Sequence, residues 1–379
     1  MNNRSGYFVN QPGGFKSFVP NKLPPTNPSI KYDQEMINAL SKAERMLGRL
    51  DGVTQVLPNP ELFVAMYVKK EAVLSSQIEG TQASLTDLFE ESEDEGKIKH
   101  VSEIVNYINA MNYGIERLNT LPLSLRLIRE IHQCLLRDVR GGERNPGEFR
   151  RSQNWIGPKG STLSNAVFVP PAVPDMIQGL NDLESFINEK DEISPLIKIA
   201  LIHAQFESIH PFLDGNGRMG RLLITFWLYN EQILSKPLLY LSYYFKLFRE
   251  DYYNSLMNVR LNGDWETWIK FFLKGVSYVS REAIDTAKEI LELKEECEKQ
   301  IGEYSNTYYS NCLNYLFEYP VVSKPQLEDQ LKIAAPTVGR IVDKMCSLGI
   351  LKDITPQKQR YKRYAFDKYL SILNRGTEI

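Results

Sequence analysis

The segment 210–221 constrains the fold of this chain more than any other, because it ends one helix and begins another. It runs His-Pro-Phe-Leu-Asp-Gly-Asn-Gly-Arg-Met-Gly-Arg. The preceding residues 195–209 are apolar with helical spacing, which predicts a buried helix. Pro211 cannot continue that helix, since proline lacks the N–H and clashes with the preceding turn. We therefore expect a helix, a tight loop, and a second helix that begins near Arg218.

The loop has the physical properties of an anion site. Gly215 and Gly217 can adopt positive φ, and Asn216 tolerates it. Successive backbone N–H groups would then point into one concavity at the positive end of the second helix's dipole, where phosphate commonly binds. Arg218 and Arg221 are three residues apart, so they share a helix face and can hold two phosphoryl groups.

Two other side chains of this loop suit nucleotide chemistry. Asp214 is placed to hold Mg²⁺, which keeps most of its waters and needs only one or two protein carboxylates besides phosphate oxygens. His210 can accept a proton from an incoming hydroxyl. The alternative is a glycine-rich turn with surface salt bridges and a structural histidine. The combination of His, Asp and two Arg at these offsets favours the nucleotide site.

The same segment resembles the signature of the Fic family, His-x-Phe-x-(Asp/Glu)-Gly-Asn-Gly-Arg-x-x-Arg, and matches it at every defined position. Members of that family are mostly protein adenylyltransferases, which move AMP from ATP onto a hydroxyl side chain of a target protein. The resemblance implies a mainly α fold, a Fic-type helical bundle with a small β-hairpin flap. It also implies that His210 is the catalytic base, that Asp214 holds Mg²⁺ and that Arg221 contacts the γ-phosphate. The nucleotide-binding residues implied in the loop are Gly215, Asn216, Gly217, Arg218, Gly220 and Arg221.

Residues 149–174 predict a β-hairpin, because two β-prone runs flank a turn rich in Gly, Pro and Ser. An exposed hairpin edge can dock a peptide by strand addition. This hairpin resembles the flap of Fic proteins, which lies over the site and aligns the target segment. An ordinary surface hairpin is the alternative. The resemblance adds four flap residues to the nucleotide-binding set: Asn165, Ala166, Val167 and Phe168.

The residues from Ser75 to Gly80 fit the pattern (Ser/Thr)-x-x-x-Glu-(Gly/Asn). The pattern resembles the inhibitory helix of Fic proteins that carry the inhibitor on the N-terminal side. Glu79 could form a bidentate bond with Arg221 and so occupy the donors meant for the γ-phosphate. ATP would then bind only with a mispositioned α-phosphate. The alternative is a solvated glutamate before a glycine cap.

Tyr252, Tyr253 and Arg260 belong to a helix predicted over residues 248–261. The resemblance assigns them to an adenine or ribose pocket, and a core position is equally open. His203 lies in an apolar stretch, so we expect a hydrogen-bonded core residue there rather than a metal ligand.

Composition places limits on the class of protein. The 379 residues allow two to three domains, and 42% hydrophobic with 24% charged residues is ordinary for a globular protein. A net charge of −2 argues against a wholly nucleic-acid-binding protein. No apolar run reaches about 18 residues, so we expect no transmembrane helix and no membrane partner. Four scattered cysteines without a Cys-x-x-Cys motif suit a reducing cytosol, and we expect a cytoplasmic protein.

We expect the chain to consist of five consecutive parts: a flexible N-terminal arm over 1–30, a helical segment with the inhibitory helix over 31–100, the catalytic core over 101–284, a linker helix over 285–305, and a winged helix-turn-helix domain over 306–379. The arm is rich in Asn, Pro and Gly and lacks the order of a signal peptide. Early helices are expected over 32–50, 60–78 and 83–91, with the acidic run 90–95 as a solvated loop.

The last part, 306–379, predicts helices over 308–319, 324–331 and 336–348, followed by two short strands. That order resembles a winged helix-turn-helix. Five Lys/Arg and one acid over 356–368 form a basic wing suited to phosphate contact. DNA binding is one interpretation, and a protein-docking or dimer-forming module is the other.

Two functions of different class follow. The first is a Mg²⁺- and ATP-dependent protein adenylyltransferase that modifies a Ser, Thr or Tyr of a target protein docked on the flap, autoinhibited by Glu79. The second is a nucleotide-sensing, DNA-binding regulator. His210 favours the first, because a sensor needs no base. Removal of AMP or transfer of another phosphate-linked group would use the same motif, and self-modification and a homodimer also remain open.

Overall fold

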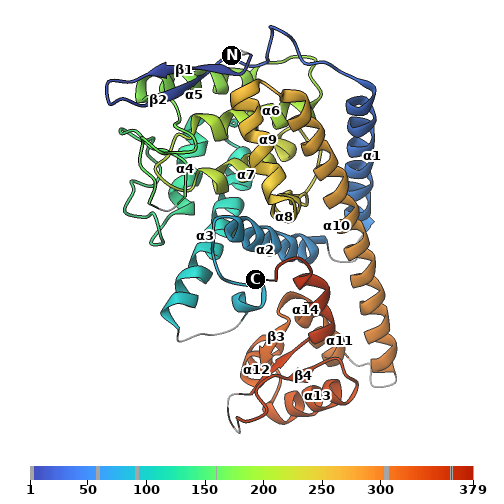
Figure 1. Cartoon of the computed structure of the whole chain (residues 1–379). Helices are drawn as coiled ribbons and strands as arrows, with labels where there is room; N and C mark the ends of the chain where they lie inside the picture. Colours follow the sequence, from blue (N-terminus) through green and yellow to red (C-terminus); the bar gives the residue numbers. More distant parts are fainter. Residues whose placement is uncertain are drawn as a thin grey trace.

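The computed structural model describes residues 4–56, 60–89, 94–158, 160–302, 307–358, 360 and 362–378. This part of the chain is mainly helical with small antiparallel sheets (Figure 1), which confirms the predicted fold class. None of its helices combines the length and the apolar character that crossing a membrane requires.

The N-terminal residues form an antiparallel hairpin of β1 (Gly6–Asn10) and β2 (Lys16–Pro20). Phe18 of β2 is only 1% exposed, and Arg4 forms an ion pair of 2.7 Å with Glu266, far along the chain. These contacts correct the prediction of a flexible arm over 1–30, because a composition rich in Asn, Pro and Gly does not reveal a long-range partner.

A long helix connects the core with the C-terminal part of the chain. Helix α10 (Trp265–Ile301) runs without a break from the core to the C-terminal part, beside α1 (Gln34–Val56) over its first half (Figure 1). The segment predicted as a separate linker helix over 285–305 is therefore, up to Ile301, the second half of α10.

The core surrounds helix α6 (Pro195–Ile209), which is buried along almost its whole length. A helix that is apolar on all sides is stable only inside a layer of other helices, and α6 packs against α5, α7, α9 and α10. The helices of the core are α2 (Pro60–Ile78), α3 (Glu95–Leu118), α4 (Leu125–Leu135), α5 (Val173–Asn188), α7 (Asn216–Asn230), α8 (Ser242–Leu247) and α9 (Arg249–Asn262).

The helix predicted over 83–91 is wrong in its described part. Only a single 3₁₀ turn forms, η1 (Thr86–Leu88). Asp87 accepts hydrogen bonds from the backbone N–H and the hydroxyl of Ser84, a local arrangement that competes with helical bonding. Residues 90 to 93 of the predicted acidic loop lie outside the described residues, and α3 begins directly after them.

The C-terminal part contains the three predicted helices, shifted by no more than one residue. Its sheet has the order β3-β5-β4 and is antiparallel, and the sequence did not predict β3 or the last helix. The C-terminal end of the chain lies close to α2 (Figure 1). The elements are α11 (Thr307–Glu318), β3 (Val321–Ser323), α12 (Lys324–Leu331), α13 (Ala335–Ser347), β4 (Lys352–Asp353), β5 (Arg363–Ala365) and α14 (Asp367–Asn374).

Candidate functional site

The loop between α6 and α7 begins and ends with a residue in the left-handed backbone conformation. His210 ends α6 with φ of 49°, and Gly215 precedes α7 with φ of 75°. Asn216 and Gly217 are not among the positive-φ residues, since they already form the first turn of α7. This corrects the expected run of positive φ. The free N–H groups that face an anion are instead those of a helix N-terminus.

Side chains fix the backbone of this loop from within. The Asn216 amide donates to the Phe212 carbonyl at 2.8 Å, and its oxygen accepts from the Phe212 N–H at 2.8 Å. Asn154 donates to the same carbonyl at 2.9 Å. The Phe212 ring is fully buried and stacks on His132, with ring centroids 3.7 Å apart. The loop is therefore held in one conformation before any ligand binds.

His132 is a functional residue that the sequence did not reveal. Its Nδ1 accepts from the Gly147 N–H at 2.9 Å, so Nε2 carries the proton and donates to the Asp214 carbonyl at 3.0 Å. Burial lowers the pKa of His132 to about 4, which keeps this tautomer neutral at pH 7. His132 positions the backbone of the candidate metal ligand, although its sequence context on α4 indicates only helix packing.

His210 is oriented through its backbone and leaves its ring available. Its carbonyl accepts from Arg150 Nε at 3.0 Å and from Asn154 Nδ2 at 3.2 Å. The ring Nδ1 is buried and finds no hydrogen-bond partner among the described residues. Burial, followed by the positive charges of Arg260 and Arg150, lowers the pKa of His210 to about 3. The imidazole is therefore neutral at pH 7, which is the protonation state that a proton acceptor needs.

Arg218 lies beneath the loop with its side chain 1% exposed. Its nearest carboxylates are Asp214 at 3.7 Å and Glu103 at 3.8 Å, and Nε and Nη1 have no hydrogen-bond partner in the described part of the chain. Buried donors without a partner are costly unless a ligand satisfies them. A phosphate oxygen is a suitable acceptor for these donors.

Asp214 fits a Mg²⁺ ligand by its chemistry. One carboxylate oxygen accepts from the Gly215 N–H at 2.7 Å, and the other lies 3.7 Å from Arg144. The side chain stays partly exposed beside the helix N-terminus. The described residues contain no cluster of three or more potential metal ligands. Mg²⁺ uses one or two carboxylates together with the oxygens of bound phosphates, so the Asp214 carboxylate fits this role by its chemistry.

Arg221 is held from the end of α2. Glu79 accepts from Arg221 Nη2 at 2.8 Å, and Ser75 accepts from Nε through its hydroxyl at 2.8 Å and from Nη2 through its carbonyl at 2.9 Å. The predicted pairing of Glu79 with Arg221 is present, but it is a single bond rather than the predicted bidentate one, because Ser75 uses the remaining donors on that side. A Cβ at Gly217 would collide with Glu79 Oε1, so this glycine permits the contact.

The charges of this pair support each other. Burial alone would raise the pKa of Glu79, but the attraction of Arg221 outweighs it and holds that pKa below its usual value. Burial alone would lower the pKa of Arg221, and Glu79 raises it instead. Gly80, directly after Glu79, has φ of 93° and turns the chain away from the site.

The three residues assigned to the adenine or ribose pocket all lie on α9 but differ in exposure, and Arg260 is buried. Tyr252 is a core residue: its hydroxyl donates to His203 Nε2 at 2.9 Å, while His203 Nδ1 donates to the Gly220 carbonyl at 3.0 Å. This also confirms the prediction for His203. Tyr253 is 39% exposed, and its hydroxyl is close enough to Glu79 and Arg221 for their charges to act on its pKa.

The flap is less regular than the predicted hairpin. Its two arms pair at one antiparallel bridge, between Ile156 and Phe168. Asn165 caps its turn by accepting from the Thr162 N–H at 2.6 Å. Val167 is 58% exposed.

Comparisons with known proteins agree with this architecture. A family model described as Fic/DOC family N-terminal matches residues 37–116, and one described as Fic/DOC family matches residues 122–228. The protein named Protein adenylyltransferase Fic of Drosophila grimshawi is 33% identical over 135 residues, which are 35% of this chain and 26% of that protein. Its namesake of Aedes aegypti is 38% identical over 105 residues, 27% of this chain and 19% of that protein. The matched region thus spans about a quarter of the length of these relatives or less.

Two solved structures share the fold. A Fic family protein from Desulfovibrio desulfuricans has a TM-score of 0.58 and 19% identity, over 89% of this chain and 97% of that one. A Fic domain containing signaling protein from Bacteroides thetaiotaomicron has a TM-score of 0.51 and 20% identity, over 68% of this chain and 97% of that one. At these identities the likeness establishes the fold alone.

Proposed function

Because this chain belongs to the Fic/DOC family, we propose that it is a protein adenylyltransferase that transfers AMP from ATP to a hydroxyl side chain of a target protein. One observation carries the proposal. His210 presents a buried, neutral imidazole nitrogen without a hydrogen-bond partner among the described residues, six residues before the first residue of α7, the helix that carries two buried arginines. A base beside an anion site is what attack of a hydroxyl on a phosphate requires.

The reaction follows from this arrangement. His210 takes the proton of the target hydroxyl as its oxygen attacks the α-phosphorus of ATP. A P–O bond to the target forms, the bond between the α-phosphorus and its bridging oxygen breaks, and pyrophosphate leaves. The N–H groups at the start of α7 and the unpaired donors of Arg218 would stabilise the charge on the phosphates. Asp214 would hold Mg²⁺, which neutralises phosphate charge when bound.

The pair of Glu79 and Arg221 supports autoinhibition. The Glu79 carboxylate uses an Arg221 donor that a γ-phosphate would need, and the side chain of Arg221 is 2% exposed. A bound ATP must therefore displace Glu79 or place its terminal phosphate elsewhere. We expect the protein to be weakly active until Glu79 leaves this position.

The C-terminal part is proposed as a winged helix-turn-helix that acts through protein contacts. Three of the five basic residues of its wing are already paired within the chain. Lys362 lies 2.8 Å from Asp353, and Arg363 donates to the Phe89 carbonyl. Lys368 lies 2.8 Å from Glu296 on α10. These contacts leave fewer free cations for DNA phosphates, so docking of a protein is favoured over DNA binding.

The test incubates wild type, Glu79→Gly and His210→Ala with Mg²⁺, a mixture of Ser-, Thr- and Tyr-containing peptides, and ATP labelled at the α- or the γ-phosphate. We expect label on protein or peptide only from the α position, most in Glu79→Gly and none in His210→Ala. Label from the γ position would indicate phosphoryl transfer instead. Absence of label in every variant, with ATP binding intact, would contradict adenylyl transfer and favour a nucleotide sensor. A cytoplasmic location stays a prediction.

A further inference from the structure

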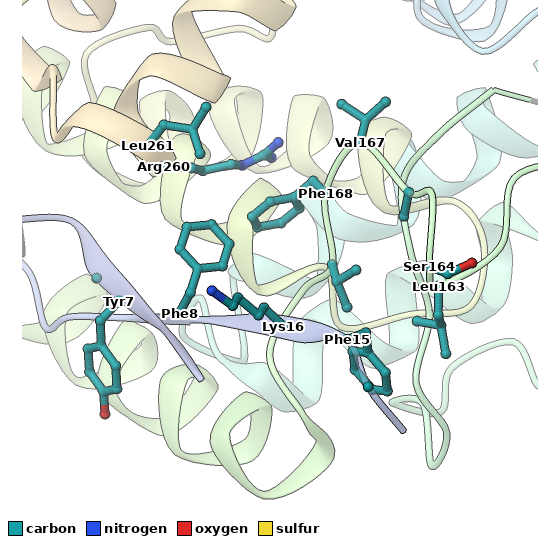
Figure 2. Close-up of a pocket in the computed structure, with 14 residues that line it drawn as sticks. Tyr7, Phe8, Phe15, Lys16, Leu163, Ser164, Val167, Phe168, Arg260 and Leu261 are labelled. Carbon is teal, nitrogen blue, oxygen red and sulfur yellow. The ribbon is translucent and has the colours of Figure 1, made fainter. Parts of the chain in front are cut away.

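A cavity of about 610 Å³ lies between the N-terminal hairpin and the flap (Figure 2). Three segments line it: the hairpin of β1 and β2, the flap residues 163–169, and the end of α9 at Arg260 and Leu261. The loop 210–221 does not line it, so this cavity is separate from the phosphate-binding part of the site.

The hairpin is a fixed wall of the cavity. The Phe18 N–H donates to the Val169 carbonyl of the flap at 2.9 Å. The Phe18 ring lies between the rings of Phe8 and Phe168, with centroids 5.3 Å and 5.7 Å away. Burial of aromatic rings in such contacts stabilises the pairing of hairpin and flap.

The cavity reaches the candidate catalytic residue through Arg260. This guanidinium lies 4.2 Å from the centre of the Phe168 ring, and donates to the Glu207 carbonyl at 2.9 Å and to the Ser208 hydroxyl at 3.2 Å. Glu207 and Ser208 belong to the last turn of α6, which ends at His210. Arg260 therefore links the cavity lining to the helix end that carries His210, on which its positive charge also acts.

Both walls offer backbone groups to an extended chain. In the part of the protein that the structure describes, the N–H groups of Ala166 and Val167 make no hydrogen bond. On the other wall, the Phe18 N–H points away from β1 and toward the flap. That N–H is already bonded to Val169, but in an antiparallel pair its direction repeats every second residue, so the backbone of Lys16 points the same way.

The side chains define what such a chain should carry. Figure 2 shows Phe8 and Lys16 extending from the hairpin into the space beside Phe168 and Arg260. Among the described residues that line the cavity, Lys16 and Arg260 are the charged ones, and none is Asp or Glu. The hydrogen-bond acceptors of Arg260 are neutral groups. Apolar side chains and negative charge are therefore favoured, and a basic segment is disfavoured.

We propose that this cavity binds an extended segment of the target protein that carries a large apolar side chain and a carboxylate close to the acceptor hydroxyl. The apolar side chain packs between Phe8 and the flap, and the carboxylate lies near Lys16. The inference rests on the proposed function. It states that the N-terminal hairpin recognises the residues around the modified hydroxyl of the target.

The test measures binding of short fluorescein-labelled peptides to the full chain by anisotropy, without ATP. All three peptides contain one Thr in a Gly/Ser background and differ at two positions. The first carries Phe and Asp there, the second Phe and Lys, and the third Ala and Asp. Burying a Phe is worth about 1.5–3 kcal/mol, so the Ala peptide should bind at least about tenfold more weakly. An exposed charge pair contributes less, about fivefold at most.

A charge reversal separates recognition from a merely structural role. In Lys16→Glu, the preference should change from the Asp to the Lys peptide. Lys22→Glu is the matched control, since Lys22 lies just past β2, is 76% exposed and does not line the cavity. Equal binding of all three peptides, or an unchanged preference in Lys16→Glu, would overturn the proposal.

The readouts keep this proposal distinct from the proposed function. Binding with the expected preference but no AMP transfer from α-labelled ATP would leave the docking site in place and remove the enzyme. AMP transfer without any peptide preference would support the enzyme and contradict the docking site. If wild type is a dimer, Phe8→Asp is a monomer and no peptide binds, then a second copy occupies this face and the proposal is wrong.

Discussion

Two buried arginines, Arg221 on α7 and Arg260 on α9, are held in different ways. Arg221 pairs with the carboxylate of Glu79, whereas Arg260 donates to neutral oxygens and lies against the ring of Phe168. Glu79 raises the pKa of Arg221, which burial alone would lower. Burial lowers the pKa of Arg260 to about 10.

Arg221 therefore has a partner that a ligand can replace, whereas Arg260 has a permanent one. The partner of Arg221 comes from another helix and is 32% exposed, so it can leave and be replaced by a phosphate. Arg260 donates to the Glu207 carbonyl in the last turn of α6, which cannot leave without unfolding that turn, and to Met257 on its own helix. We expect Arg221 to respond to ATP and Arg260 to provide a constant positive field for the target segment.

The largest effect should follow removal of the replaceable partner, Glu79. Glu79→Gly frees an Arg221 donor from a charge-assisted bond worth about 1.5–3 kcal/mol, so the rate of AMP incorporation should rise by about 10- to 100-fold. Initial rates measured with α-labelled ATP test this. Glu79→Gln, which keeps the shape and loses the charge, should give an intermediate rate. An unchanged rate in a folded Glu79→Gly protein would mean that Glu79 does not inhibit the reaction by occupying Arg221.

The same substitution should reduce stability only while ATP is absent. Without Glu79, Arg221 is a buried charge with Ser75 as its remaining partner, which costs roughly 1–3 kcal/mol. ATP should recover this loss, so the rise of Tm on adding ATP should be larger in Glu79→Gly than in wild type. Thermal unfolding with and without ATP measures it. Equal rises in both proteins would mean that ATP does not replace Glu79.

Glu207 lies between the two arginines and gives a pH-dependent effect. Burial, only partly offset by Arg221, raises the pKa of Glu207 to about 7. Between its unfolded pKa of about 4.5 and pH 7 the folded state holds a proton that the unfolded state releases, so this group's contribution to stability falls as pH rises. Glu207→Gln removes that loss.

Relative to wild type, Glu207→Gln should therefore be more stable at pH 8 than at pH 5, by about 2–3 kcal/mol. Urea unfolding at both pH values tests the sign. A stability difference that is the same at both pH values would mean that Glu207 is ionised throughout and already compensates Arg260.

The smallest effect concerns the C-terminal end of the chain. Lys246 donates to Gln77 at 2.7 Å and to the Glu378 carbonyl at 2.7 Å, and Gln77 lies two residues before Glu79. Lys246→Ala should loosen this end of α2 and raise activity by about two- to threefold, the equivalent of one exposed contact. The matched control is Lys274→Ala, which removes a surface ion pair with Glu35. A similar change in both variants would show that the tail does not hold the inhibitory segment.

The residues of the site were predictable where the chemistry is local. Helix α6, the turn at Pro211 and the helix after Gly215 follow from rules about proline, glycine and apolar spacing, and α6 has the predicted bounds. The pairing of Glu79 with Arg221 was predicted from a family pattern, and its geometry was not. The second oxygen acceptor on Arg221 is Ser75, four residues earlier on α2.

What the sequence did not reveal depends on distant partners. The N-terminal hairpin is ordered by Arg4 with Glu266 and by Phe18 with the flap, contacts that composition cannot predict. His132 holds the carbonyl of Asp214, 82 residues away, and no local pattern marks it. Tyr252 and Tyr253 are adjacent in sequence, yet one is core and the other faces the site, because a helix turns consecutive side chains by about 100°.

The most direct test compares ADP and ATP binding by calorimetry in His210→Ala, with and without Glu79→Gly, so that no nucleotide is consumed. If Glu79 occupies the place of the γ-phosphate on Arg221, ADP and ATP should bind almost equally well while Glu79 is present. Removing Glu79 should then favour ATP over ADP by about tenfold, the value of one regained charge-assisted bond. The same ratio of the two Kd values with and without Glu79 would contradict the account.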